Sequence, residues 1–182
     1  MTDFRQVHPD GVIIAVDRMR AYLKASLKQV WYPVGQTPTM RVAPQRDSVA
    51  FYGALEVIGG QEIALSLPKM TGANTVHFFE HVMACFPGRH ILLLLDRAPW
   101  HKGEARDFIE AQPLLEMMYF PPACPELNPQ EHVWKLARDA VGHLRDYAHI
   151  GDLRQAFQTH FDQTLFDIRW AAKYLPPILL RI

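Results

Sequence analysis

Cysteine is scarce in this chain, and long apolar runs are absent. The 182 residues include two cysteines, Cys85 and Cys124, too few for a disulfide framework or a cysteine-based zinc module. No apolar run reaches the length of a transmembrane helix, and the first residues, MTDFRQVHPDG, lack the basic and then apolar pattern of a secretion signal. We therefore expect a soluble protein of a reducing cytoplasm with no membrane partner.

A surplus of charge of either sign is also absent. The 19 Lys and Arg residues balance the 19 Asp and Glu residues, so the net charge gives no general support for nucleic-acid binding. A local patch exists, however, because positions 18 to 46 hold six basic residues and no acidic one: Arg18, Arg20, Lys24, Lys28, Arg41 and Arg46. Such a patch can neutralise phosphates, although a solvated strand face produces the same pattern.

No Gly/Ser-rich or low-complexity segment divides the chain, and 49% of its residues are hydrophobic. That content suffices for one good core, so we expect a single domain over residues 1–182. A buried strand over 12–17 leads into strict alternation over 18–28, which predicts a half-buried strand with a basic outer side. Two β-prone runs, 48–58 and 61–68, flank Gly59-Gly60 and predict a hairpin.

The rest of the chain alternates between helical and strand patterns. The spacing of apolar residues predicts helices over 74–86, 102–112 and 129 to about 142, and strands over 90–95 and 114–120. A last amphipathic helix is lined by Leu153, Ala156, Phe157, Phe161 and Leu165. Trp31 and Trp134 are expected in the core, where large aromatic side chains usually lie.

Three acidic residues lie where apolar segments end or a helix begins. Asp17 closes GVIIAVD, Asp96 closes ILLLLD, and Glu131 follows the turn YFPPACPELNPQ. The thirty-four residues from 97 to 130 separate the last two acids. Carboxylates delivered in this way are the hard oxygen ligands that Mg²⁺ prefers, with positions left open for a substrate phosphate. The pattern predicts a metal-dependent phosphoryl-transfer site.

The segments around these acids resemble the DDE transposases of mariner and its bacterial insertion-sequence relatives, in the integrase superfamily. The family's D-x-A-x-x-H segment is similar to DRAPWH at 96–101, and its S-P-E-L-N-P-x-E-x-x-W segment is similar to CPELNPQEHVW at 124–134. The spacing of the last two acids resembles the bacterial branch. The W-x-x-x-G motif is matched from Trp31 to Gly35, so the resemblance covers nearly the whole chain.

This resemblance implies an α/β fold of the ribonuclease-H-like class, with a mixed five-stranded sheet flanked by helices. The order of elements in the apolar pattern agrees with it. In such folds the first and fourth strands lie side by side and parallel, which brings Asp17 and Asp96 together while Glu131 reaches across from its helix. The resemblance implies that these acids hold two Mg²⁺ or Mn²⁺ ions and catalyse DNA strand cleavage and strand transfer in transposition.

The resemblance also implies partners. DNA of the element ends and of the target would be bound by a homodimer at the bacterial nucleoid, and candidate DNA contacts are the six basic residues above together with Arg97, His101 and Lys102. The helix-turn-helix region of the family is missing from this sequence. We therefore expect either the second product of a split reading frame or a truncated copy, with a separate chain supplying the DNA-reading region.

Three alternatives compete with this interpretation. In the first alternative, Asp96 and Glu131 both have structural roles. Asp96 caps a turn, and Glu131 is the capping-box residue at the third position of a helix that Asn128 caps and Pro129 begins. An inactive remnant that only binds DNA or dimerises is favoured by Arg18 and Arg97, which depart from the family. Finally, H-x-x-E-H at 77–81 resembles a zinc metallohydrolase helix, with His77, Glu80 and His81 as its site.

Overall fold

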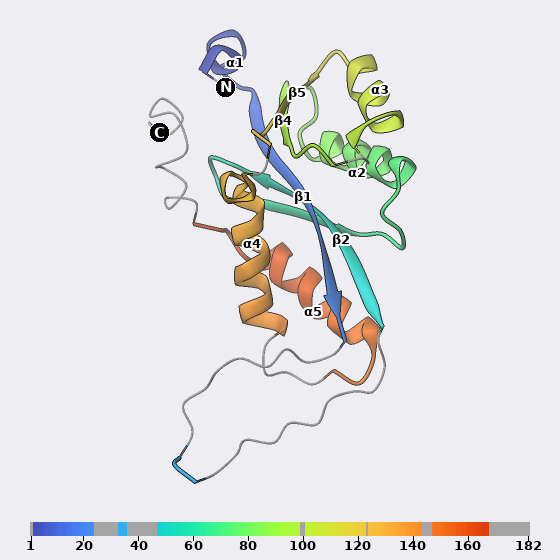
Figure 1. Cartoon of the computed structure of the whole chain (residues 1–182). Helices are drawn as coiled ribbons and strands as arrows, with labels where there is room; N and C mark the ends of the chain where they lie inside the picture. Colours follow the sequence, from blue (N-terminus) through green and yellow to red (C-terminus); the bar gives the residue numbers. More distant parts are fainter. Residues whose placement is uncertain are drawn as a thin grey trace.

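The computed structural model describes residues 2–23, 33–35, 47–98, 101–122, 124–142 and 147–167. Within these ranges one sheet contains five strands: β1 (Val12–Tyr22), β2 (Ser48–Glu56), β3 (Glu62–Ser66), β4 (Ile91–Leu95) and β5 (Leu115–Tyr119). Their order is β3-β2-β1-β4-β5, with β1, β2 and β3 antiparallel and β4 and β5 parallel to β1 (Figure 1). The predicted mixed five-stranded sheet is confirmed.

The first strand is longer than its buried segment. Residues 12–16 are buried without interruption, and the second half of β1 alternates between buried and exposed positions. The two patterns in the sequence therefore belong to one strand, which serves both the central and the outer part of the sheet. The predicted continuation to residue 28 lies outside the described residues, as do Trp31 and four of the basic candidates: Lys24, Lys28, Arg41 and Arg46.

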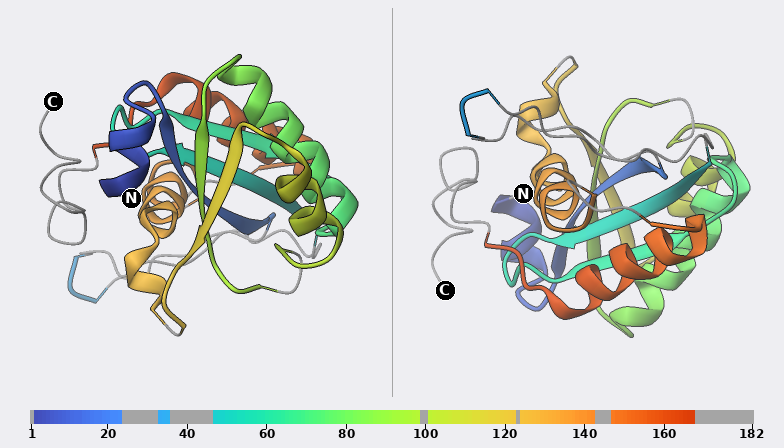
Figure 2. Two further views of the ribbon diagram at one scale, coloured as in Figure 1. Left: turned by 90° about the horizontal axis from the view of Figure 1, so that it is seen from above. Right: turned by 90° about the horizontal axis from the view of Figure 1, so that it is seen from below.

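Helices cover both faces of the sheet (Figure 2). On one face, α2 (Gly72–Cys85) and α3 (Glu104–Ala111) pack on a core that includes Phe78, Phe79 and Ile109. On the other face, α4 (Pro129–Ala137) and α5 (Ile150–Gln163) enclose a second core around Trp134 and Phe157. This arrangement confirms the predicted helices, with one correction: α5 ends at Gln163, so Leu165, which was predicted on its apolar face, lies beyond the helix and is exposed. No helix among the described residues is long and apolar enough to cross a membrane.

Two short helical segments were not predicted, and one predicted helix changes type near its end. A six-residue helix, α1 (Thr2–Val7), precedes β1, and a 3₁₀ turn, η2 (Pro125–Leu127), precedes α4. The predicted helix over 129–142 ends as a π-helical turn, η3 (Arg138–Gly142). Segments of this length span less than two helical turns, so they leave no apolar periodicity to detect.

Strand alternation directs two of the acids to the same face of the sheet. In β1, Val12, Ile14 and Val16 face α2, so Ile13, Ala15 and Asp17 face the other way. The parallel register sets Ala15 beside Leu94, and extending it by two residues sets Asp17 opposite Asp96. The fold therefore delivers both carboxylates to the face that carries α4.

Candidate functional site

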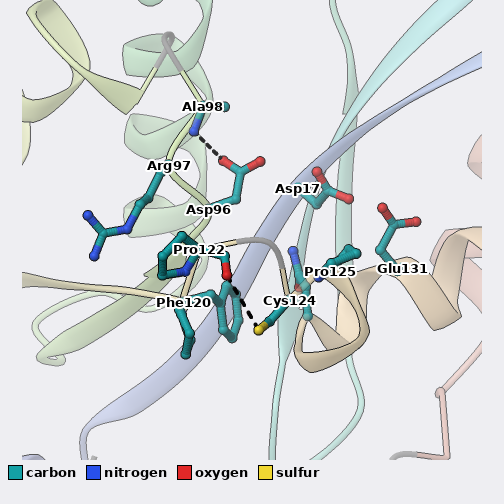
Figure 3. Close-up of a pocket in the computed structure, with 11 residues that line it drawn as sticks. Asp17, Asp96, Arg97, Ala98, Phe120, Pro122, Cys124, Pro125 and Glu131 are labelled. Carbon is teal, nitrogen blue, oxygen red and sulfur yellow. Dashed lines mark hydrogen bonds between the residues drawn. The ribbon is translucent and has the colours of Figure 1, made fainter.

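Asp17, Asp96 and Glu131 line one open cavity of about 330 Å³. Asp17 comes from β1, Asp96 follows β4 directly, and Glu131 comes from the first turn of α4 (Figure 3). The rest of the wall comes from the segment after β4 and from the Pro-rich segment between β5 and α4: Arg97, Ala98, Phe120, Pro121, Pro122, Cys124, Pro125 and Asn128. The three acids identified in the sequence thus converge on one place.

Asp17 is the most enclosed of the three carboxylates. The indole Nε1–H of Trp134 donates a hydrogen bond of 3.1 Å to its Oδ2 atom. The pKa of Asp17 is raised to about 6, mainly by burial and also by the neighbouring carboxylates of Glu131 and Asp96, against the lowering effect of its hydrogen bonds. Negative charge at Asp17 is therefore costly in the protein alone, and a cation in the cavity would relieve that cost.

Asp96 is held by two donors. Its Oδ1 atom accepts the backbone N–H of Ala98 at 3.0 Å and lies 2.8 Å from Nδ1 of His101. Burial by itself would raise the pKa of Asp96, but the hydrogen bonds from His101 and Ala98 and the positive charge nearby keep that pKa below its usual value. The predicted turn-capping role is therefore real and coexists with a place in the cavity wall.

The predicted role of His101 as a DNA contact is wrong. The sequence offered it as a DNA contact, but its side chain is only 1% exposed and lies against Asp96. The hydroxyl of Tyr119 donates to its backbone oxygen at 3.4 Å. Buried in this way, His101 has no surface to present to DNA, and it orients Asp96 instead.

Glu131 lies at the start of α4, which is fixed to β1 by Asn128. The Oδ1 atom of Asn128 accepts the Gln130 N–H at 3.1 Å, which caps the helix, and its Nδ2 atom donates to the Val16 carbonyl at 3.2 Å. The backbone N–H of Asn128 donates to Pro125, so this amide already has the partner that a capping box would have supplied. Glu131 is exposed and faces the cavity.

A buried hydrogen bond between Gln130 and Glu62 joins α4 to β3. Gln130 is fully buried, and its Nε2 atom donates to Oε1 of Glu62 in β3 at 2.7 Å. Burial raises the pKa of Glu62 well above its usual value, against the lowering effect of its hydrogen bond from Gln130. Sequence reasoning missed this pair, and the available signal was an acidic residue inside an apolar strand.

The described basic candidates differ in their surroundings. Arg18 projects to the opposite face from Asp17, where its Nη1 atom donates to the Tyr52 hydroxyl at 3.1 Å and its guanidinium lies 5.0 Å from the Tyr52 ring centre. Arg97 lines the cavity, yet its side chain points away from the acids (Figure 3). Arg20 and Lys102 are exposed. Neither departure from the family pattern, Arg18 or Arg97, occupies the space between the carboxylates.

The rival zinc motif lies on an exposed face of α2. His77 and His81 are both exposed, and Nδ1 of His77 lies 3.7 Å from Oε2 of Glu80. In the described part of the chain, no third metal-ligating side chain joins them to form a compact group. A zinc-hydrolase site needs three protein ligands at least, so this geometry does not favour it.

Comparison with known proteins gives matches in sequence, to a family model and to one curated protein, and matches in structure. Residues 12–154 match the family model described as DDE superfamily endonuclease. An uncharacterized protein of Sinorhizobium fredii (strain NBRC 101917 / NGR234), y4pE/y4sA, is 35% identical over 89 residues, which make up 48% of this chain and 64% of that protein.

The structural matches concern the fold. The Mos1 transposase in a paired-end complex with the left transposon end has a TM-score of 0.69 at 15% identity, over 98% of this chain and 56% of that one. The catalytic core domain of BIV integrase has a TM-score of 0.52 at 12% identity, over 82% of this chain and 80% of that domain's chain. The predicted ribonuclease-H-like fold is thereby confirmed, and the chain spans about half the length of the Mos1 protein.

Proposed function

Because this chain belongs to the DDE superfamily endonucleases, we propose that it is the catalytic domain of a bacterial insertion-sequence transposase. Its reaction is the metal-dependent cleavage of a DNA strand and the transfer of the new end to a target. The observation that carries the proposal is the convergence of Asp17, Asp96 and Glu131, from three separate elements, on one open cavity.

The donor set fits divalent cations with a preference for oxygen. All three acids offer carboxylate oxygens, as Mg²⁺ and Mn²⁺ require. Burial, with smaller contributions from the nearby Glu131 and Asp96 carboxylates, raises the pKa of Asp17, so a cation beside it would favour its charged form. We assign Asp17, Asp96 and Glu131 as the ligands of two ions. Ions held there would supply activation of an attacking water or DNA 3′-hydroxyl and stabilisation of the leaving oxygen in an in-line displacement at phosphorus.

The other residues of the site hold these ligands in place. Trp134 and His101 each donate to one aspartate and so fix its orientation. Asn128 fixes the start of α4, and with it Glu131, to the backbone of β1 beside Asp17. These contacts prepare the carboxylates before substrate arrives, which is the usual source of electrostatic stabilisation of a transition state.

DNA is the proposed partner, as element ends and as target. The Mos1 structure described above is a complex with a transposon end, which supports the same class of substrate here. Arg20, Arg97 and Lys102 are proposed to contact the DNA backbone, since they are exposed on the described surface, and Arg18 is proposed only as a more distant positive charge. A homodimer, and a separate chain that carries a helix-turn-helix region, remain part of the proposal.

The test combines calorimetry with DNA cleavage. The wild-type protein should bind Mn²⁺ and nick supercoiled DNA, and Asp96→Asn and Glu131→Gln should lose both properties while keeping the circular dichroism spectrum and Tm of a folded protein. Glu80→Gln, on the exposed face of α2, is the matched control and should behave as wild type. Nicking that persists in Glu131→Gln would refute the site. If wild type and the variants all fail to bind Mn²⁺, the result would favour an inactive remnant.

A further inference from the structure

A second group of metal-ligating side chains lies at the other end of the sheet. His8 follows α1, His90 precedes β4, and Glu116 is the second residue of β5. Figure 1 shows α1 beside this end of β4 and β5. The five residues of β4 separate His90 from Asp96, a path of roughly 20 Å at the usual rise per residue. The group is therefore independent of the acidic cavity.

The three side chains approach one another closely. Nε2 of His8 lies 3.3 Å from Oε1 of Glu116, and the rings of His8 and His90 are stacked with their centres 3.6 Å apart. One possible ligand atom from each residue lies within 4.8 Å of the other two. Two imidazoles and a carboxylate so near each other need only small side-chain rotations to share one ion.

Backbone contacts hold these residues on a firm frame. The His8 N–H donates to the Phe4 carbonyl at 2.7 Å, and the Val12 N–H donates to the His90 carbonyl at 2.8 Å. Glu116 is paired with Leu92 in the β4–β5 ladder. The main chain that carries each ligand is thus fixed by its own hydrogen bonds, so binding an ion requires no reordering of the backbone.

The chemistry of the group selects the ion. Two imidazole nitrogens and one carboxylate oxygen are a common ligand set for Zn²⁺, which takes three protein ligands and leaves a fourth position for water. Mg²⁺, in contrast, prefers oxygen ligands and keeps several waters. The two ends of the sheet therefore have opposite preferences, with carboxylates alone at one end and mainly imidazoles at the other.

We propose that His8, His90 and Glu116 form a zinc-binding site that fastens α1 to the amino ends of β4 and β5. The site lies away from the acidic cavity, and none of its residues takes part in the proposed reaction. Its effect is to bind a six-residue helix, too short to be stable by itself, to the amino ends of β4 and β5.

Zinc binding is measured by calorimetry on the full chain, with excess Mg²⁺ present to occupy the acidic cavity. We expect one equivalent of Zn²⁺ to bind, and Co²⁺ in its place to show the visible absorption of a nitrogen- and oxygen-ligated ion. His8→Ala, His90→Ala and Glu116→Gln should each weaken binding by more than about tenfold, since even the loss of an outer partner of a metal ligand costs that much.

Two controls separate this site from the others in the chain. The double variant His77→Ala/His81→Ala removes exposed histidines of α2 and should bind Zn²⁺ as wild type does, and Asp17→Asn should also leave binding unchanged. Each variant is first shown to be folded by its Tm without zinc. The proposal is overturned if wild type binds no Zn²⁺, if binding survives in all three site variants, or if it is lost in either control.

Hydrogen exchange provides a readout that does not depend on affinity. Bound Zn²⁺ should slow exchange of the His8 and Val12 amides, which hydrogen-bond to Phe4 and His90, and should leave amides of α5 unchanged. If His8 and Glu116 only form an ion pair and bind no metal, Zn²⁺ will not slow exchange of these amides. The absence of zinc-dependent protection would therefore also overturn the proposal.

Discussion

The indole N–H of Trp134 donates to the Asp17 carboxylate at 3.1 Å, although the two residues are 117 positions apart in the chain. Trp134 is also 1% exposed and packs against Phe161 at 5.6 Å between ring centres. One side chain therefore belongs to the core between α4 and α5 and also holds a carboxylate that lines the acidic cavity. This relationship connects core packing directly to the orientation of a proposed metal ligand.

Trp134→Phe should lower the rate of DNA nicking while leaving the protein folded, with a Tm close to that of wild type. Phenylalanine keeps most of the aromatic packing but cannot donate to Asp17, and hydrogen bonds to charged groups contribute about 1.5–3 kcal/mol. We expect at least about a tenfold loss of nicking rate, on the conversion of 1.4 kcal/mol to a factor of ten. Phe161→Leu is the control, because it disturbs packing against Trp134 and leaves the hydrogen bond; an equal loss of activity in both variants would contradict the assignment.

Gly53→Ala should damage the site without touching a carboxylate. Gly53 lies opposite Asp17 in β2, and a Cβ atom there would collide with the side chains of Trp134, Gln130 and Glu62. Overpacking of this kind costs about 1–3 kcal/mol, so Tm and nicking should both fall. Gly151→Ala, at an open position of α5, should leave nicking unchanged and Tm the same or higher. A Gly53→Ala protein with wild-type Tm and activity would show that the space behind Asp17 is not tight.

Asp17→Asn should stabilise the metal-free protein at pH 7.5 and not at pH 3.5. Burial raises the Asp17 pKa from 3.8 to about 6, so the folded protein binds a proton more tightly than the unfolded chain does. Stability from this group is complete below pH 3.8 and is lost as pH rises to about 6. The loss is at most about 3 kcal/mol. Denaturant unfolding across this range measures it, and excess Mn²⁺ should stabilise wild type more than the variant. A pH-independent difference would contradict the assignment.

His101→Leu should shift the pH dependence of Mn²⁺ binding upward. The hydrogen bond from His101 holds the Asp96 pKa below its usual value, so its removal lets Asp96 protonate at a higher pH and compete with metal. Calorimetry from pH 5 to 8 should show the largest loss of affinity at the acidic end. His101→Asn, whose amide can replace the Nδ1 donor, should recover part of the affinity. Equal losses at every pH would indicate a general structural defect.

The position of the three acids was predictable because two of them close apolar runs that pair in parallel, and the third begins a helix. The strand that carries Asp17, however, continues to Tyr22 instead of ending at the acid. Their supporting contacts were not predictable from the sequence. The core position of Trp134 followed from its size, but its bond to Asp17 depends on which face of α4 meets β1. The Glu62–Gln130 pair and the His8–His90–Glu116 group join residues far apart in the chain, and no local pattern connects them.

The hydrogen bond from Asn128 to the Val16 carbonyl spans 112 residues and has a consequence for biosynthesis. During translation, β1 and β4 leave the ribosome before α4 does, so a growing chain carries two of the acids well before the third. Until α4 has docked on β1, Asp17 lacks its indole donor and Glu131 is not beside it. A polypeptide that terminates before residue 129 therefore lacks one of the three proposed metal ligands, so the proposed site is assembled only after α4 has been synthesised and has docked.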